Sequence, residues 1–149
     1  MLTAGHVMKR NVHVLRPDHD VLDAVETLLQ RGFSGAPVID RDRIVGIFSE
    51  RDGLTAIASA HYEGEPPGNV AQHMRRDFRV VTAATDLYEV ASLFRAYPIR
   101  RMPVVEDLDS ARLVGIISRG DVLKALRKLY AHREKSNYER LQDHMDLLQ

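Results

Sequence analysis

The chain of 149 residues has no cysteine and no tryptophan, and its 21 Lys and Arg balance 21 Asp and Glu. Without cysteine there is no disulfide framework, thiolate metal site or cysteine nucleophile. Balanced charge disfavours a nucleic-acid or acidic-membrane surface. Aromatic residues make up only 6%, too few for a platform that stacks single-stranded bases. No apolar run has the length of a signal peptide or membrane span. We therefore expect a soluble cytoplasmic protein with no nucleic-acid and no membrane partner.

The common sequence signatures of catalysis are also missing. The seven histidines form no pair at i and i+4 and no tight cluster, so a histidine metal site is not expected. The acidic residues Asp18, Asp20 and Asp23 lack the pattern of a calcium loop. Neither a P-loop nor a nucleophile elbow is present. The sequence therefore predicts a protein that is not an enzyme and holds no resident metal ion.

What the chain does contain is an internal repeat in two copies. With an offset of 66 residues, Met8 aligns with Met74 and Pro37 with Pro103. Farther on the offset becomes 69, because the second copy has a longer turn at residues 106–112. A long repeat that occurs only twice indicates two supersecondary units related by a pseudo-twofold axis, since a solenoid needs more copies.

Local signals give each unit the order strand, helix, strand, strand, helix. First strands are expected near residues 12–14 and 78–80. Asp20 and Asp86 are N-cap residues ahead of runs in which apolar residues recur at the helical period. Two pairs of short apolar runs predict hairpins, 36–39 with 44–48 and 102–105 with 113–117. The predicted fold class is therefore α/β, with helices packed on mixed sheets.

These signals divide the chain into four segments. Residues 1–60 are the first unit, 61–68 a linker rich in helix breakers, 69–130 the second unit, and 131–149 a C-terminal helical extension. The extension has a narrow apolar seam formed by Tyr138, Leu141, Met145 and Leu148. Two interpretations stay open: this helix packs on its own domain, or its seam forms a contact between subunits.

Both hairpins end in the motif Gly-apolar-x-Ser-x-x-Asp, where a strand runs into a helix, at residues 46–52 and 115–121. The N-terminus of a helix offers unpaired backbone N–H groups and partial positive charge, which favour a phosphate. Ser49 or Ser118 adds a hydroxyl there. The carboxylate three residues later can accept hydrogen bonds from two ribose hydroxyls. Each corner therefore suits a phosphorylated ribose.

A purely structural interpretation of the motif is also available. Serine with an acidic residue three positions later forms a helix cap, which stabilises a helix by about 1 kcal/mol. For a single copy the cap alone is the better explanation, whereas the repeat favours binding at one corner or both. Gly46 and Gly115 are then expected to leave room for a ligand to approach the backbone.

The two units resemble a tandem of CBS domains (the cystathionine β-synthase type), a Bateman module. The resemblance covers roughly residues 5–127 and is carried by the two corner motifs and by segments 34–39 and 100–105. It implies a stand-alone regulatory sensor that binds AMP, ADP or ATP, or another adenosyl ligand such as S-adenosylmethionine or NAD. It implies no covalent cofactor, with Mg²⁺ as an optional companion of the phosphates. It also implies a homodimer.

The resemblance further implies which residues form the two sites. The pair Arg100 and Arg101 stands where such modules reach phosphates, and guanidinium groups suit phosphate oxygens, although a solvated surface pair is the alternative. The first strand of each unit is expected to cover the base bound by the other. The main site is assigned to Ser118, Asp121, Arg100, Arg101, Arg119, Ile117, Val12, His13, Met102 and Pro103. The second site is assigned to Ser49, Asp52, Arg51, Ile47, Gly35, Phe78 and Arg79.

The function expected from the sequence is non-catalytic sensing of an adenine nucleotide in the cleft between the units, as in energy sensing. Phosphate should bind more tightly at the Ser118 corner, because the first copy has the uncharged pair Ser34 and Gly35 where the second has two arginines. A protein target regulated in trans would respond to the bound state. The alternative is a structural or oligomerisation module whose pockets are degenerate.

Overall fold

The first unit is built around an antiparallel hairpin of β1 (Gly35–Asp40) and β2 (Arg43–Ser49), against which α2 (Val21–Arg31) and α3 (Glu50–Glu63) pack. The computed structural model describes residues 1–148. The Asp20 carboxylate accepts hydrogen bonds from two backbone N–H groups at the start of α2, as its N-cap position predicts. Leu28, Val38 and Phe48 are fully buried in the core of this unit.

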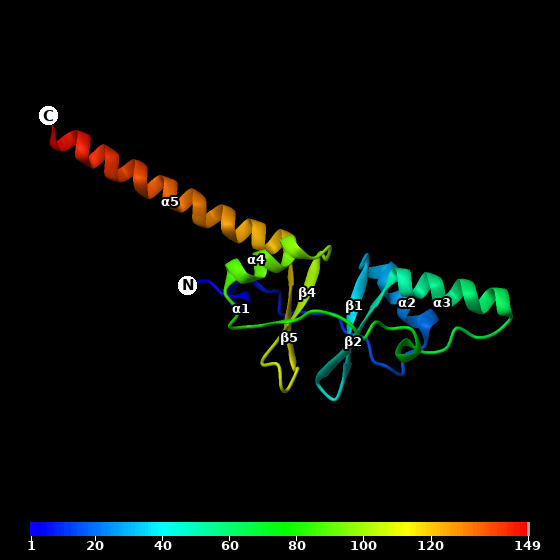
Figure 1. Ribbon diagram of the computed structural model, residues 1–149. Coiled ribbons are helices and arrows are strands. Elements are labelled where there is room, and N and C mark those ends of the chain that lie inside the picture. Colours follow the sequence, from blue (N-terminus) through cyan, green and yellow to red (C-terminus); the bar gives the residue numbers. More distant parts are fainter. Residues whose placement is uncertain (149) are drawn as a thin grey trace.

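The second unit has a three-stranded sheet in the order β3-β4-β5. Its strands are β3 (Val81–Thr82), β4 (Arg101–Val105) and β5 (Leu113–Ser118), with β3 parallel and β5 antiparallel to β4. The helices are α1 (Ala4–Val7), α4 (Leu87–Ala96) and α5 (Arg119–Leu147), and a single 3-10 turn, η1 (Val70–Gln72), joins the units. Figure 1 shows the two hairpins side by side, with α1, α4 and α5 beside one of them and α2 and α3 beside the other. The α/β fold class predicted from the sequence is confirmed.

The repeat is visible in the strand register. Gly35 pairs with Ser49 in the first hairpin, and Arg101 pairs with Ser118 in the second. Each hairpin also has a register shift at the same place, after Val38 in β1 and after Val104 in β4. Ser49 and Ser118 therefore occupy equivalent positions in the two hairpins, but the residue opposite is a glycine in the first and an arginine in the second.

The N-terminal segment of each sequence repeat packs on the other unit. Lys9 exchanges two backbone hydrogen bonds with Ile116 of β5, and Arg75 does the same with Ile47 of β2. Ala4 of α1 is fully buried in the core of the second unit. The sequence boundaries at residues 60 and 69 thus follow the repeat, whereas the packing places residues 2–8 with the second unit.

The first strands differ from the sequence expectation in position and length. Leu15 makes one isolated parallel bridge to Val38, and only Val81–Thr82 form a strand in the second copy. Residues 12–14 and 78–80 form no strand and pair with no neighbouring strand in the described chain. The physical reason is burial: Leu15 and Val81 enter the cores, while the residues expected in the strands are half-buried or exposed.

Two helices cross the boundaries that the sequence predicts. α3 continues into the segment 61–68 and ends at Gly64, whose φ of 71° is a left-handed conformation that suits glycine. α5 runs without interruption past residue 130 and projects away from both units (Figure 1). The apolar seam beyond residue 130 is exposed, so the described chain does not show this part of the helix packed on its own domain. No helix among residues 1–148 is long and apolar enough to cross a membrane.

Candidate functional site

At the second corner, Ser118 and Asp121 cap the start of α5 reciprocally. The Ser118 Oγ accepts a hydrogen bond from the Asp121 backbone N–H at 3.0 Å, and Asp121 Oδ2 accepts one from the Ser118 N–H at 3.0 Å. The other carboxylate oxygen, Oδ1, lies 3.7 Å from Lys9 Nζ. The Asp121 side chain is only 11% exposed, so its carboxylate is held in one orientation. This corner presents a fixed acceptor beside the N-terminus of a helix.

The first corner has the same architecture with one difference. Asp52 Oδ2 accepts a hydrogen bond from the Ser49 N–H at 2.8 Å, and Ser49 Oγ accepts one from the Asp52 N–H at 3.3 Å. The Ser49 hydroxyl also donates to Asp52 Oδ2 at 2.8 Å. No matching donation by the Ser118 hydroxyl occurs among residues 1–148. The capping interpretation of both motifs therefore holds. Of the two serine hydroxyls, that of Ser118 can donate a hydrogen bond to a ligand without giving up one to its own aspartate.

The paired arginines lie directly against the second corner. Arg101 is opposite Ser118 in the β4–β5 ladder, and the Arg100 carbonyl accepts a hydrogen bond from the Arg119 N–H at 2.9 Å. The Arg101 guanidinium reaches across to the first unit, where Nη1 lies 3.4 Å from Ser34 Oγ. Both arginines and Arg119 are exposed. The structure thus brings three cationic side chains of the expected main site to one end of the hairpin.

Three other residues of the expected main site lie in the core. Ile117 and Met102 are fully buried, and Pro103 is also among the fully buried side chains. The half-buried neighbour Ile116 pairs with Lys9 instead. Successive side chains of a strand point to opposite faces, so a site residue predicted one position too far along the strand points into the core. The offset of 69 contained the missing signal, because it aligns Ile116, not Ile117, with Ile47.

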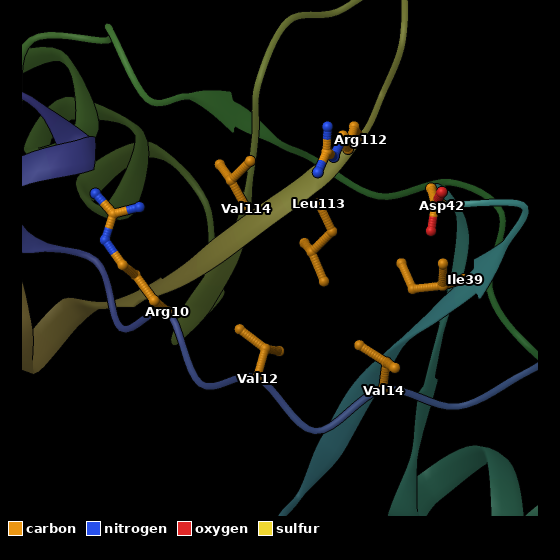
Figure 2. A pocket seen from close by; sticks show the side chains of 8 residues that line it. All are labelled: Arg10, Val12, Val14, Ile39, Asp42, Arg112, Leu113 and Val114. Carbon is orange, nitrogen blue, oxygen red and sulfur yellow. The ribbon is translucent and has the colours of Figure 1, made fainter.

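Val12 lies in a cavity between the two units, about 270 Å³ in volume. Figure 2 shows its side chain on the segment that passes below β5, with the tip of the first hairpin on the other side. The cavity is lined by Arg10, Val12, Val14, Ile39, Asp42, Arg112, Leu113 and Val114. Its five aliphatic side chains can pack against a flat aromatic group, while Arg10, Arg112 and the Asp42 carboxylate make most of the exposed lining polar.

Asp121 lines a different cavity, of about 410 Å³, between α1 and α5. Lys124 and Lys128 line the same cavity one helical turn apart. Neither lysine is among the site residues predicted from the sequence, although both follow Asp121 at helical spacing. The expected main site is therefore divided, with the carboxylate in one cavity and Val12 in the other. Residues 9–12 connect them, since Lys9 contacts Asp121 and Arg10 lines the cavity of Val12.

His13 points away from its neighbour Val12, toward the first unit. Its ring centroid lies 6.1 Å from that of Phe33, and its Nε2 atom is covered without a hydrogen-bond partner in the described chain. Desolvation by burial lowers the pKa of His13, with smaller contributions from the charges of Arg31 and His19. The structure does not bring His13 to the Ser118 corner.

The residues expected at the second site are less concentrated. The Arg79 guanidinium lies 3.5 Å from the centroid of the Tyr97 ring, a cation–π contact within the second unit. Phe78 and Ile47 are half-buried, and Arg51 is exposed. Gly35 pairs with Ser49, where a Cβ would come 3.2 Å from the Phe48 carbonyl oxygen.

Gly46 and Gly115 do not provide room for a ligand. A Cβ on Gly115 would lie 2.5 Å from Met8 Sδ, and one on Gly46 would lie 2.6 Å from Met74 Sδ. The exchanged segments already occupy both positions, which corrects the sequence expectation. The alignment of Met8 with Met74 in the repeat was the signal for this packing. Among residues 1–148, no group of three or more His, Asp or Glu could hold a metal ion.

Comparison with known proteins agrees with this architecture. The family model for the CBS domain matches the chain twice, over residues 4–59 and 70–128. Protein MJ1225 of Methanocaldococcus jannaschii is 32% identical over 134 residues, which cover 88% of this chain but only 46% of the relative. The structure of CBSX2, a CBS-pair protein of Arabidopsis thaliana, in complex with AMP is 32% identical with a TM-score of 0.74. That similarity covers 87% of this chain and 99% of CBSX2.

Proposed function

Because the chain belongs to the CBS-domain family, we propose that it binds an adenosine nucleotide reversibly, without catalysis, with the phosphates at the Ser118 corner. The observation that carries this proposal is the register of β4 and β5, which sets Arg101 directly opposite Ser118. CBSX2, which was solved with AMP, supports the choice of ligand class.

Each group at this corner has a chemical role in the proposal. The Ser118 hydroxyl and the guanidinium groups of Arg100 and Arg101 bind phosphate oxygens, because charge-assisted hydrogen bonds to phosphate are strong. The fixed carboxylate of Asp121 accepts the ribose hydroxyls and exchanges its contact with Lys9 for them. Lys124 and Lys128 add positive potential at the same edge.

The adenine is proposed to lie toward Val12 in the cavity between the units. Lys9 and Val12 are three positions apart in the chain, a span of at most about 10 Å, which a nucleoside monophosphate can bridge. The half-buried Ile116 takes the place of Ile117 as the apolar contact from β5. The second corner, at Ser49 and Asp52, is proposed as the weaker site, since no arginine stands opposite Ser49.

Regulation in trans follows from a ligand that lies across both units. A ligand shifts the equilibrium between two arrangements of the units only if it binds one arrangement more tightly than the other. We propose that the protein acts as a homodimer and that a separate target protein recognises the bound arrangement. The competing function is a structural module with empty corners, which the complete capping boxes favour because they are satisfied without a ligand.

A thermal-shift screen tests the proposal. AMP, ADP, ATP, S-adenosylmethionine and NAD are compared with and without Mg²⁺, because that ion accompanies nucleotide phosphates. At a hundredfold excess over Kd, one site stabilises the folded state by about 2.7 kcal/mol. For a domain of this size the melting temperature should rise by roughly 5–10 °C.

The matched variants Asp121→Ala and Asp52→Ala separate binding from capping. Each removes the same kind of capping box, so both should lower the unliganded melting temperature alike. The nucleotide-induced shift should disappear in Asp121→Ala and persist in Asp52→Ala. If none of the five ligands produces a shift in the wild type, the structural module is the correct function. Hydrolysis of ATP that depends on Asp121 would instead show an enzyme.

A further inference from the structure

Five apolar side chains on the outer face of α5 are uncovered, two in its proximal part and three in its distal part. Its distal part exposes 68% of Tyr138, 63% of Leu141 and 74% of Leu148. Its proximal part exposes 63% of Leu123 and 65% of Tyr130. In Figure 1 the distal part extends away from both units. Most of the stability of helices in proteins comes from packing, so contact with another surface is expected to stabilise the distal part.

These side chains form one stripe. Leu123 and Tyr130 are seven residues apart, as are Leu141 and Leu148, and Leu141 follows Leu123 by 18 residues. At about 3.6 residues per turn, 18 residues make about five turns, so both pairs lie on the same side of the helix. Because both pairs have the same spacing, the distal pair of one helix can align with the proximal pair of a second, antiparallel helix.

The charges of α5 are distributed unevenly between its halves. Residues 119–133 contain five Lys or Arg and one Asp, a net charge of +4. Residues 134–148 contain four Asp or Glu and two Lys or Arg, a net charge of −2. Two copies side by side in parallel would place the basic halves together. An antiparallel pair places each basic half against the acidic half of its partner, which is electrostatically favourable.

We propose that α5 is an interaction surface for a second copy of this chain, on which the two α5 helices pair antiparallel. Leu123 of one copy packs against the partner's Leu148, and Tyr130 packs against the partner's Leu141. The twofold axis then passes between residues 135 and 136. At the axis Glu134 faces the partner's Asn137, whose amide can donate to the carboxylate. The occupant is a second copy because the stripe and the charges are both self-complementary in this register.

Disulfide trapping tests the orientation without background, because the chain has no cysteine. Tyr130→Cys and an affinity-tagged Leu141→Cys chain are mixed and oxidised, and the products are separated on a non-reducing gel. The antiparallel register brings residues 130 and 141 together but keeps two copies of residue 130 about 16 Å apart along the helices. A disulfide needs Cα atoms closer than about 7 Å. Mixed dimers should exceed self-linked dimers at least tenfold.

Two results of this experiment would overturn the proposal. If each variant oxidised alone forms abundant disulfide-linked dimers, and mixed dimers do not exceed them in the mixture, the helices pair in parallel. No crosslinked product in any mixture would show that the stripe is not a contact between copies.

Sedimentation velocity on full-length variants tests the strength of the contact. Leu141→Glu places a charge on the stripe and should raise the Kd of self-association at least tenfold. Leu147→Glu is the matched control, because Leu147 is 85% exposed in the same distal part of α5 but lies off the stripe. It should change that Kd less than twofold. Equal behaviour of the two variants would contradict the proposed face. Nucleotide-induced thermal shifts should be unchanged in both, since neither residue lies near Ser118.

Discussion

Met8 packs directly over Gly115, and any side chain at position 115 would have to displace it. A Cβ there would lie 2.5 Å from Met8 Sδ and 2.9 Å from the Lys9 carbonyl oxygen. Lys9 is the residue whose backbone pairs with Ile116 and whose side chain faces Asp121. The glycine therefore fixes the segment that supplies one wall of the candidate site.

Gly115→Ala should lower the free energy of unfolding by about 1–3 kcal/mol, because overpacking forces the methionine or the backbone to move. Chemical denaturation measures this change. Gly120→Ala is the control, since its Cβ would meet only Ser118 Oγ at 3.8 Å, and alanine favours the helix by up to about 1 kcal/mol. Adding Met8→Ala to Gly115→Ala should recover part of the loss. If the double variant is as unstable as the two single effects added together, the proposed contact is not the cause.

Arg101→Ala should weaken AMP binding about tenfold or more, because a charge-assisted hydrogen bond to phosphate contributes roughly 1.5–3 kcal/mol. Binding of adenosine, which has no phosphate, should be unchanged. Isothermal titration calorimetry measures both affinities. Arg133→Ala removes the same charge from the exposed part of α5 and serves as the control. Equal weakening of AMP binding by the two variants would indicate a general charge effect in place of a contact at the corner.

Stability should fall as the pH falls through about 6.5, partly because of His13. Burial lowers its pKa in the folded chain, so between the lowered pKa and 6.5 the unfolded chain binds more protons than the folded one. The folded state is therefore favoured above this window and loses that advantage inside it. Melting temperatures of the wild type and of His13→Gln are compared between pH 8 and pH 5.

The His13→Gln variant should lose less stability than the wild type on acidification. His144→Gln, on the exposed end of α5, should follow the wild-type curve. A His13→Gln curve parallel to that of the wild type would show that another group causes the acid dependence.

A chain that ends at residue 130 should keep its fold and its nucleotide affinity. From residue 131 to 148 only Ser136 is half-buried, and the two cores use nothing beyond Leu126. The melting temperature should change by only a few degrees, because little buried surface is removed. Self-association should weaken, since the distal half of the stripe is lost. Loss of nucleotide binding with an intact fold would instead assign the tail to the ligand site.

The sequence predicted the repeat, the capped helices and the two hairpins because these depend on local signals. Asp20 caps α2 and Ser49 caps α3 as the local motifs predict, regardless of the rest of the chain. It did not predict that Met8 and Met74 would fill the space at the two glycines, since an empty position and an occupied one look the same in a sequence.

The candidate site shows the same division between local and tertiary information. Ser118, Asp121 and Arg101 meet because strand register and helix capping fix them. Ile117 was chosen on the wrong face of a strand, and His13 turns toward Phe33 because neighbouring residues in extended chain point to opposite sides. The offset of the repeat could have corrected the first of these, and the adjacency of Val12 and His13 indicated the second, since neighbours in extended chain cannot face the same site.

The exchange of N-terminal segments determines the order in which the two units can fold during synthesis. The first unit lacks its η1 turn and Met74 until residue 75 has emerged, and Met8 has no Gly115 to cover until the last strand is made. Contacts between such distant parts of the chain are slow to form because loop closure costs entropy. The first unit can therefore close once residue 75 has emerged, whereas residues 2–8 wait for the last strand of the second unit.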